Sequence, residues 1–198
     1  NWLAKGDKGE GEESAAAMRH NGDDWQGGRG VNPEYEVHRP DNDGDGLSDK
    51  WEKINKRDPK DGRLHFEFDC GGWQTEGWTA IGTDDNIAGF LGFLDIELDG
   101  PEATLARDDL KAKTTKNDIA LALKLRSSGK LTITALANGN PLGAPTTIEG
   151  GDSHTEVRIP IATNKAWSGT IGSLQIKLSG KKGDVIEVDS IVVERKDS

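Results

Sequence analysis

The sequence predicts an all-β fold, a jelly-roll β-sandwich, preceded by a linker with one short helix and by an irregular N-terminal segment. Two observations predict the sandwich. Apolar and polar residues alternate in short runs from residue 64 onward, and turns rich in glycine, proline and asparagine separate these runs. No long run with helical periodicity lies between them, so the strands should form antiparallel sheets. Two such sheets must stack to bury their apolar faces.

The alternation is clearest in residues 90–99, where Leu94, Ile96 and Leu98 face one way and acidic residues face the other. The same pattern recurs in residues 65–69, 119–125, 131–133, 157–161, 174–178 and 184–195. Together with the turns, these runs predict about nine to ten short strands in a sandwich that spans residues 63–198.

The first forty residues differ from the rest of the chain, since they are hydrophilic and show no periodicity. We interpret residues 1–40 as an irregular segment or as the tail of an upstream domain. The sequence begins with Asn1 rather than Met, which indicates a piece of a larger protein.

Residues 41–52 have the spacing of a twelve-residue calcium loop. Such a loop has oxygen ligands at positions 1, 3, 5, 9 and 12, a backbone carbonyl ligand at position 7 and a glycine at position 6. Gly46 is that glycine, and it supplies the sharp turn around the ion. The predicted Ca²⁺ ligands are Asp41, Asp43, Asp45, Leu47 through its carbonyl, Asp49 and Glu52.

The residues on either side of the loop indicate a structural rather than a signalling role for the ion. Pro40 disfavours a helix before the loop, whereas Leu47, Trp51 and Ile54 recur at helical spacing after it. We expect a helix from Ser48 to about residue 57, ended by Asp58-Pro59, in a linker that spans residues 41–62.

The run Asp-Gly-Asp-Gly-Leu-Ser-Asp-Lys-Trp-Glu followed by Arg-Asp-Pro resembles the thrombospondin type 3-like calcium repeats found between domains of secreted bacterial proteins. Dockerin-type loops are similar. The resemblance implies that Asp58 and Asp61 are candidates to help bind a neighbouring ion. Because no second loop follows, the sequence departs here from a multi-ion array.

Composition and charge exclude several classes of function. A net charge of −10 argues against nonspecific binding to nucleic acid or to an anionic membrane, and no apolar run is long enough to span a bilayer. The single cysteine, Cys70, excludes an internal disulfide. No nucleophile or metal-hydrolase motif is present, so we expect no catalysis by this chain. Extracellular calcium would fill a single loop readily, which favours a secreted, extracellular or periplasmic location.

A second resemblance covers residues 66–194. Phe-x-Phe-Asp with Thr-Glu-Gly-Trp-Thr at residues 75–79, and later Trp-Ser-Gly-Thr-Ile-Gly-Ser-Leu and Val-Asp-Ser-Ile, resemble the opening and closing strands of jelly-roll carbohydrate-binding modules. Such modules are attached to secreted polysaccharide-degrading enzymes, including sulfatases and glycoside hydrolases. The resemblance therefore implies two partners, a polysaccharide of algal or sulfated type and the catalytic domain of a parent enzyme.

The resemblance also suggests where a sugar and a second ion would bind. It places Trp78 and Trp167 in the core. The candidate sugar contacts are Trp73, in a glycine-rich stretch, and three residues on one face of a predicted strand: Phe93, Asp95 and Glu97. That face is either a concave sugar-binding face or a plain solvent face. Asp69 and Asp189 would hold a second metal ion at the first and last strands, or they are two separate surface carboxylates.

Three functions remain open at this point. The first is a non-catalytic, calcium-stabilised carbohydrate-binding module. The second is a structural spacer that orients neighbouring domains without binding glycan. The third is a small polysaccharide lyase or hydrolase, which needs two carboxylates that face each other across a cleft.

Overall fold

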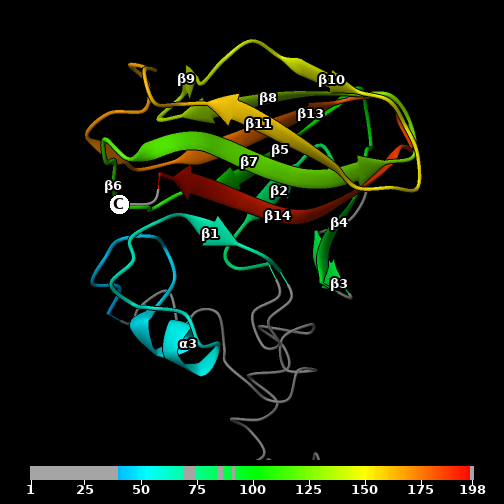
Figure 1. Ribbon diagram of the computed structural model, residues 1–198. Helices are drawn as coiled ribbons and strands as arrows, with labels where there is room; N and C mark the ends of the chain where they lie inside the picture. The colour runs from blue at the N-terminus through cyan, green and yellow to red at the C-terminus, as the bar shows by residue number, and fades with distance from the viewer. Residues whose placement is uncertain (1–39, 69–74, 84–86, 91, 197–198) are drawn as a thin grey trace, which may run out of the picture.

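The computed structural model describes residues 40–68, 75–83, 87–90 and 92–196, and of residues 88–90 it describes only the backbone. Across these ranges two antiparallel sheets stack face to face, with a small two-stranded sheet at one end (Figure 1). The all-β jelly-roll sandwich predicted from the sequence is confirmed.

One sheet is built around β14 and is called the β14 sheet below. Its strand order is β11-β7-β14-β4-β3, and β1 also pairs with β14. Both β4 and β1 pair antiparallel with β14, and a register shift on β14 between Val188 and Ser190 places Asp189 in a β-bulge. The bounds are β1 (His65–Phe66), β3 (Ala88–Phe90), β4 (Phe93–Glu97), β7 (Asp118–Ser127), β11 (Thr155–Pro160) and β14 (Val185–Arg195).

The other sheet has β13 at its centre, in the order β10-β8-β13-β5-β2, with β9 also paired to β8. A separate pair, β6 and β12, forms the small sheet. The bounds are β2 (Thr79–Ile81), β5 (Glu102–Arg107), β6 (Ala112–Lys113), β8 (Leu131–Ala137), β9 (Asn140–Pro141), β10 (Thr146–Ile148), β12 (Thr170–Ile171) and β13 (Leu174–Ser179).

The core lies between the two sheets and is filled by the apolar side of each alternating run. Inward-facing residues on the two longest strands and on β13 are almost completely buried. Trp78 and Trp167 are buried as the sequence predicts, and the Trp78 ring meets the Phe66 ring edge to face, with centroids 5.4 Å apart. The central members are Leu121, Leu123, Leu125, Leu174, Ile176, Leu178, Ile186, Val188, Ile191 and Val193.

Two predicted elements are shorter than expected. The run 65–69 forms a strand only at His65 and Phe66. Beyond it, Phe68 has φ of +59°, and the N–H groups of Glu67 and Phe68 donate to the buried carboxylate of Glu76 instead of to a neighbouring strand. A side-chain carboxylate 8 to 9 residues further along the chain therefore ends this strand, which sequence alternation alone cannot indicate.

The linker helix, α3 (Asp49–Ile54), also ends about one turn before the predicted residue 57. Ser48 caps its start, since the Ser48 hydroxyl accepts a hydrogen bond from the Trp51 N–H at 3.2 Å. At its end Lys56 has φ of +60°, and the Arg57 N–H donates to the Glu52 carbonyl at 2.7 Å. A left-handed residue thus stops the helix before Asp58-Pro59 is reached.

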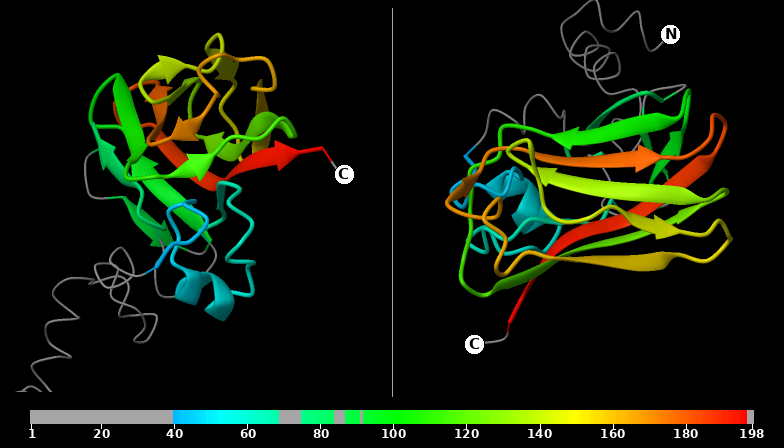
Figure 2. Two further views of the ribbon diagram at one scale, coloured as in Figure 1. Left: turned by 90° about the vertical axis from the view of Figure 1, so that its left-hand side faces the viewer. Right: turned by 90° about the horizontal axis from the view of Figure 1, so that it is seen from above.

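The linker packs against the sandwich. Figures 1 and 2 show α3 and the loop before it beside β1, on one side of the β14 sheet. Leu47 and Trp51 are each only 1% exposed, and both belong to the same hydrophobic cluster as the residues between the sheets. The apolar core therefore continues from the sandwich into the linker.

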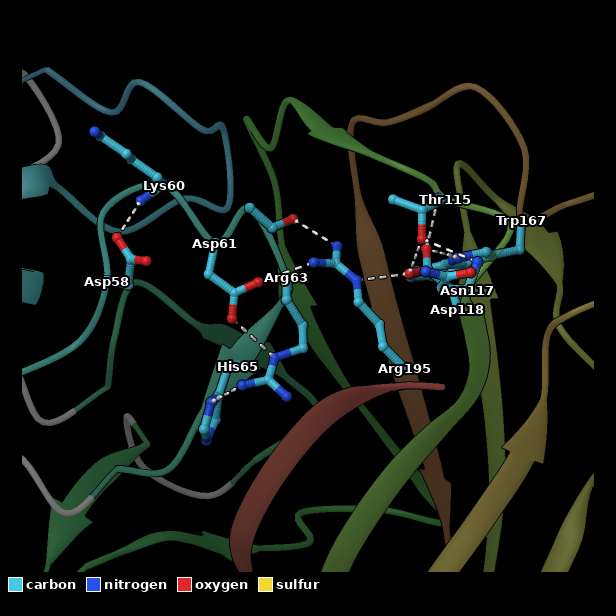
Figure 3. A network of polar contacts seen from close by, with 11 residues as sticks. Asp58, Lys60, Asp61, Arg63, His65, Thr115, Asn117, Asp118, Trp167 and Arg195 are labelled. Atoms are coloured by element: carbon cyan, nitrogen blue, oxygen red, sulfur yellow. Dashed lines mark hydrogen bonds and ion pairs between the residues drawn. The ribbon is translucent and has the colours of Figure 1, made fainter. Parts of the chain in front are cut away.

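Arg195, at the end of β14, joins the linker to the sandwich by polar contacts (Figure 3). Its guanidinium group donates to Asp61 and to Asp118, each at 2.8 Å. Asp118 is buried and also accepts hydrogen bonds from the Trp167 indole and from Thr115. Burial alone would raise the pKa of Asp118, but these hydrogen bonds outweigh it and hold the pKa below its usual value.

Candidate calcium loop and outer face of the β14 sheet

Three of the predicted calcium ligands form one acidic group, to which Asp49 and Glu52 do not belong. Asp41, Asp43 and Asp45 each offer one carboxylate oxygen, and these oxygens lie within 4.8 Å of one another. Asp41 also shapes the loop, because its carboxylate accepts from the N–H groups of Gly44 at 2.7 Å and Gly46 at 3.1 Å. Gly46 has φ of +92°, so the sharp turn predicted at this glycine is present.

Burial and mutual repulsion disfavour the charged forms of three predicted ligands. Burial is the largest cause in each case, and it raises the pKa of Asp43 to about 6, of Asp45 to about 7 and of Glu52 to about 8. Neighbouring carboxylates add to each shift. Asp45 and Glu52 are only 3% and 2% exposed. Such a group of acids needs a compensating positive charge at its centre to stay ionised.

The fit of a hard divalent cation can be tested on the buried oxygens. Both carboxylate oxygens of Asp43 and Oε2 of Glu52 are buried and accept no hydrogen bond from the described residues. Buried polar atoms are normally satisfied, so buried carboxylate oxygens without a hydrogen-bond donor suit a metal ion. An all-oxygen donor set from carboxylates is what Ca²⁺ prefers. The residues present therefore fit the predicted ion.

Two predicted ligands, Asp49 and Leu47, also form hydrogen bonds within the loop. The Asp49 carboxylate accepts hydrogen bonds from the backbone N–H of Asn42 at 2.9 Å and from its side-chain amide. It thereby closes the loop on itself, and the ninth position of such loops often reaches the ion through water. The Leu47 N–H donates to Asp45 at 2.8 Å, while the Leu47 side chain is buried in the core.

The acids after the loop have protein partners. Asp58 accepts from the Lys60 N–H, and Asp61 forms ion pairs with Arg63 and Arg195. The resemblance to calcium repeats suggested both carboxylates as ligands of a neighbouring ion. In this structure each of them contacts protein groups.

The loop touches the sandwich by close backbone contacts. The Lys111 N–H donates to the Gly44 carbonyl at 2.8 Å, and the Arg107 guanidinium donates to the Gly46 carbonyl. Gly44 has φ of +82°, and a Cβ atom there would lie 2.6 Å from the Lys111 carbonyl oxygen. Only glycine fits at this position, because it tolerates both the backbone conformation and the close approach.

A second group of polar residues lies on the outer face of the β14 sheet. Asp95 on β4, Glu187 on β14 and Arg126 on β7 stand opposite one another in register across three neighbouring strands. Arg126 donates two hydrogen bonds to the Glu187 carboxylate, at 2.7 and 2.5 Å. These bonds lower the pKa of Glu187, whereas burial and the nearby Glu187 raise the pKa of Asp95.

An aromatic pair lies beside the row formed by Asp95, Glu187 and Arg126. The rings of Phe93 and His154 stack with their centroids 5.0 Å apart and their planes 24° apart. Phe93 is on β4 and His154 immediately precedes β11, so the pair bridges the two strands that lie between β4 and β11 in the sheet. His154 Nε2 lies 4.0 Å from the Glu187 carboxylate. Both rings are half-buried and held in place, as a rigid contact surface requires.

The structure brings together some of the predicted sugar contacts. Phe93 and Asp95 share the outer face with Glu97, which is exposed at the end of β4. Asp189 lies in the β14 bulge and pairs with Lys124 at 3.0 Å. Trp73 and Asp69 lie outside the described residues, so neither the sugar contact nor the second ion predicted with them is tested.

Sequence reasoning did not single out Arg126, His154 or Glu187. The signal for two of them was present, because Arg126 and Glu187 occupy the polar positions of the alternating runs in β7 and β14. Their pairing could not be inferred, since it depends on which strands are neighbours.

The sandwich is similar to solved carbohydrate-binding modules. One, described as "CBM4 structure and function", has a TM-score of 0.49 and 19% identity, and the match covers 65% of this chain and 99% of that chain. The N-terminal cellulose-binding domain of Cellulomonas fimi β-1,4-glucanase C gives 0.45 and 16%, over 66% and 94% of the two chains. A point mutant of CBM29-2, from family 29 of carbohydrate-binding modules, gives 0.43 and 14%, over 66% and 87%.

Each likeness has a TM-score below 0.5, so none of them bears on the ligand or on the site residues. The sequence matches no protein-family model and no curated protein. Among the described residues, no helix is long and apolar enough to cross a membrane.

Proposed function

We propose that this chain is a non-catalytic carbohydrate-binding domain that holds a polysaccharide on the outer face of the β14 sheet. The observation that carries the proposal is the fixed Phe93–His154 stack beside the Asp95–Glu187–Arg126 row. Aromatic rings supply apolar area for the flat face of a pyranose, and charged groups already held by neighbours supply hydrogen bonds to its hydroxyls. In this proposal the domain belongs to a secreted polysaccharide-degrading enzyme and positions its catalytic domain on the substrate.

Binding on this face is tested by affinity electrophoresis of the full chain through gels that contain neutral or acidic plant and algal polysaccharides. Retardation by one of them is expected. Phe93→Ala should weaken this binding by at least about tenfold, as expected for a central aromatic contact. Ile81→Ala is the control, because Ile81 is 79% exposed on β2, in the other sheet.

Retardation by no polysaccharide would contradict the proposal and leave the spacer function. Equal losses in the two variants would place the contact elsewhere on the surface. Release of shorter sugars from any of the polysaccharides would contradict the non-catalytic part of the proposal and favour a lyase or hydrolase.

The proposal includes a structural Ca²⁺ held by Asp41, Asp43, Asp45 and Glu52, with Asp49 supporting the loop. Bound to these residues, the ion supplies the positive charge that keeps their buried carboxylates ionised. Because the loop packs on the sandwich, calcium at a hundred times its Kd should raise the free energy of unfolding by about 2.7 kcal/mol.

This part is tested by isothermal titration with CaCl₂ and by thermal unfolding in calcium or in EDTA. Asp45→Asn should abolish both the heat of binding and the stabilisation. Asp109→Asn is a matched control, since Asp109 is exposed and its left-handed φ of +60° suits asparagine. No heat of binding in the unaltered chain would contradict the calcium assignment.

A further inference from the structure

A groove lies between the calcium loop and the small sheet, and its lining includes none of the residues described on the outer face of the β14 sheet. Its volume is about 590 Å³. It is lined by Asp41, Asp43 and Gly44 of the calcium loop, by Lys111, Lys113 and Thr115 in and beside the small sheet, and by Lys60 and Arg195. We call it the lysine groove.

Three lysines of the groove have no acidic partner among the described residues. Lys60, Lys111 and Lys113 are exposed, and none of their ammonium groups forms an ion pair with a carboxylate in this part of the chain. In Figure 3 the Lys60 side chain extends away from the other labelled residues. Elsewhere on the described surface Lys124, Lys130, Lys177 and Lys182 pair with an acid, whereas other exposed lysines such as Lys165 and Lys181 form no ion pair with the described residues. Three exposed lysines gather in one groove of a chain with a net charge of −10.

The net charge of the groove depends on whether a cation occupies the calcium loop, because the loop contributes two acidic residues to it. Asp41 and Asp43 line the groove and are also predicted ligands of the ion. Without a cation, their carboxylates oppose the approach of an anion and partly neutralise the field of the lysines. With Ca²⁺ bound, the charge of these carboxylates is compensated, and the lysines then make the net charge of the groove positive.

We propose that the lysine groove binds the anionic groups of an acidic polysaccharide, and that it does so when calcium occupies the loop. This inference rests on the proposed glycan-binding function but concerns a separate site. Lysine ammonium groups suit carboxylate and sulfate alike, and both occur on acidic polysaccharides. The choice of a glycan over an acidic peptide follows from the proposed function, because the Asn42 amide and the Thr115 hydroxyl that also line the groove already donate to Asp49 and Asp118.

The test uses the full chain and three probes with one backbone: uncharged dextran, carboxymethyl dextran and dextran sulfate. Binding is measured by calorimetry with and without calcium, at low and at high salt. The groove variant is Lys60→Gln/Lys111→Gln/Lys113→Gln. The control is Lys130→Gln/Lys165→Gln/Lys181→Gln, which removes the same charge from exposed lysines outside the groove.

The charged dextrans should bind the unaltered chain in calcium, and the two probes show whether carboxylate or sulfate is preferred. The groove variant should bind about tenfold more weakly, because it loses three exposed charge contacts. The control variant should change Kd by less than about threefold, and EDTA should weaken binding to the level of the groove variant. Uncharged dextran should show no difference between the two variants.

Equal losses in the groove and control variants, or unchanged binding in EDTA, would overturn the inference. Polyglutamate that binds as tightly as the charged dextrans would also overturn it, in favour of an acidic peptide. The Phe93→Ala variant distinguishes binding in the lysine groove from binding on the outer face of the β14 sheet. If Phe93→Ala abolishes glycan binding while the groove variant behaves like the unaltered chain, only the groove inference fails.

Discussion

Replacing Trp51 by alanine tests whether the linker and the sandwich unfold together. The Trp51 side chain is 1% exposed, lies in the hydrophobic cluster shared with the sandwich and carries the Arg57 guanidinium 5.0 Å above its ring. Deleting a buried tryptophan costs about 3–5 kcal/mol. A small domain has only about 5–15 kcal/mol of stability, so a single substitution outside the β-strands would remove a large share of it.

For a chain of this size each kcal/mol corresponds to about 2–4 °C in Tm, so Trp51→Ala should lower the Tm by roughly 6–20 °C. The assay is thermal and urea unfolding in calcium, followed by far-UV circular dichroism, which reports on the strands of the sandwich. Ile54→Ala is the control, because Ile54 is on the same helix but 58% exposed. It should change stability by no more than about 0.5 kcal/mol.

An unchanged strand transition in Trp51→Ala would refute this reasoning. So would a separate early transition for the linker with the main transition in place. Either result would mean that residues 41–62 form an independent unit and that the division at residue 63, expected from the sequence, is also a boundary of cooperative unfolding.

Two further predictions concern single contacts. The low pKa of Asp118 contributes stability that is complete above about pH 4, the usual value for an aspartate, and is lost as the pH falls through the depressed value. Urea unfolding measured from neutral to acidic pH should show this loss. In Asp118→Asn this acid-dependent loss should be absent, and stability at neutral pH should be lower by about 1–3 kcal/mol, because the buried charged acceptor is lost while Arg195 keeps its ion pair with Asp61; an equally steep acid loss in the variant would contradict the assignment. Gly44→Ala should lower the Tm more than Gly139→Ala. Both glycines have positive φ, but only at Gly44 does the added Cβ meet a neighbour, the Lys111 carbonyl. Equal effects would show that the loop moves away at no cost.

Much of the sandwich could be predicted because local alternation and burial agree. Residues 118–127, 174–179 and 185–195 alternate clearly and form central strands. Strand β5 was missed although it lies beside β13, since its inward positions hold Ala103 and the charged Arg107 around Leu105. Arg107 is buried where it contacts the calcium loop, and its partner there, Gly46, lies 61 residues earlier in the sequence. The local pattern could not indicate it.

The calcium loop could be proposed from the sequence because all its predicted ligands fall within twelve residues, at the spacing typical of such loops. The outer face of the β14 sheet was only partly readable. Phe93 and Asp95 could be placed on one face from their spacing, but Arg126, His154 and Glu187 join them through the strand order β11-β7-β14-β4. A surface assembled from four strands depends on topology, which alternation does not encode.

The central place of β14 has a consequence for how the chain folds. This strand follows all the others in sequence, yet it lies between β7 and β4 and also pairs with β1, about 126 residues earlier. During synthesis, β4 and β7 must therefore wait with open hydrogen-bonding edges until the last strand leaves the ribosome. We expect slow folding that is limited by this final insertion, and nascent chains that depend on chaperones to keep those edges from pairing with other molecules.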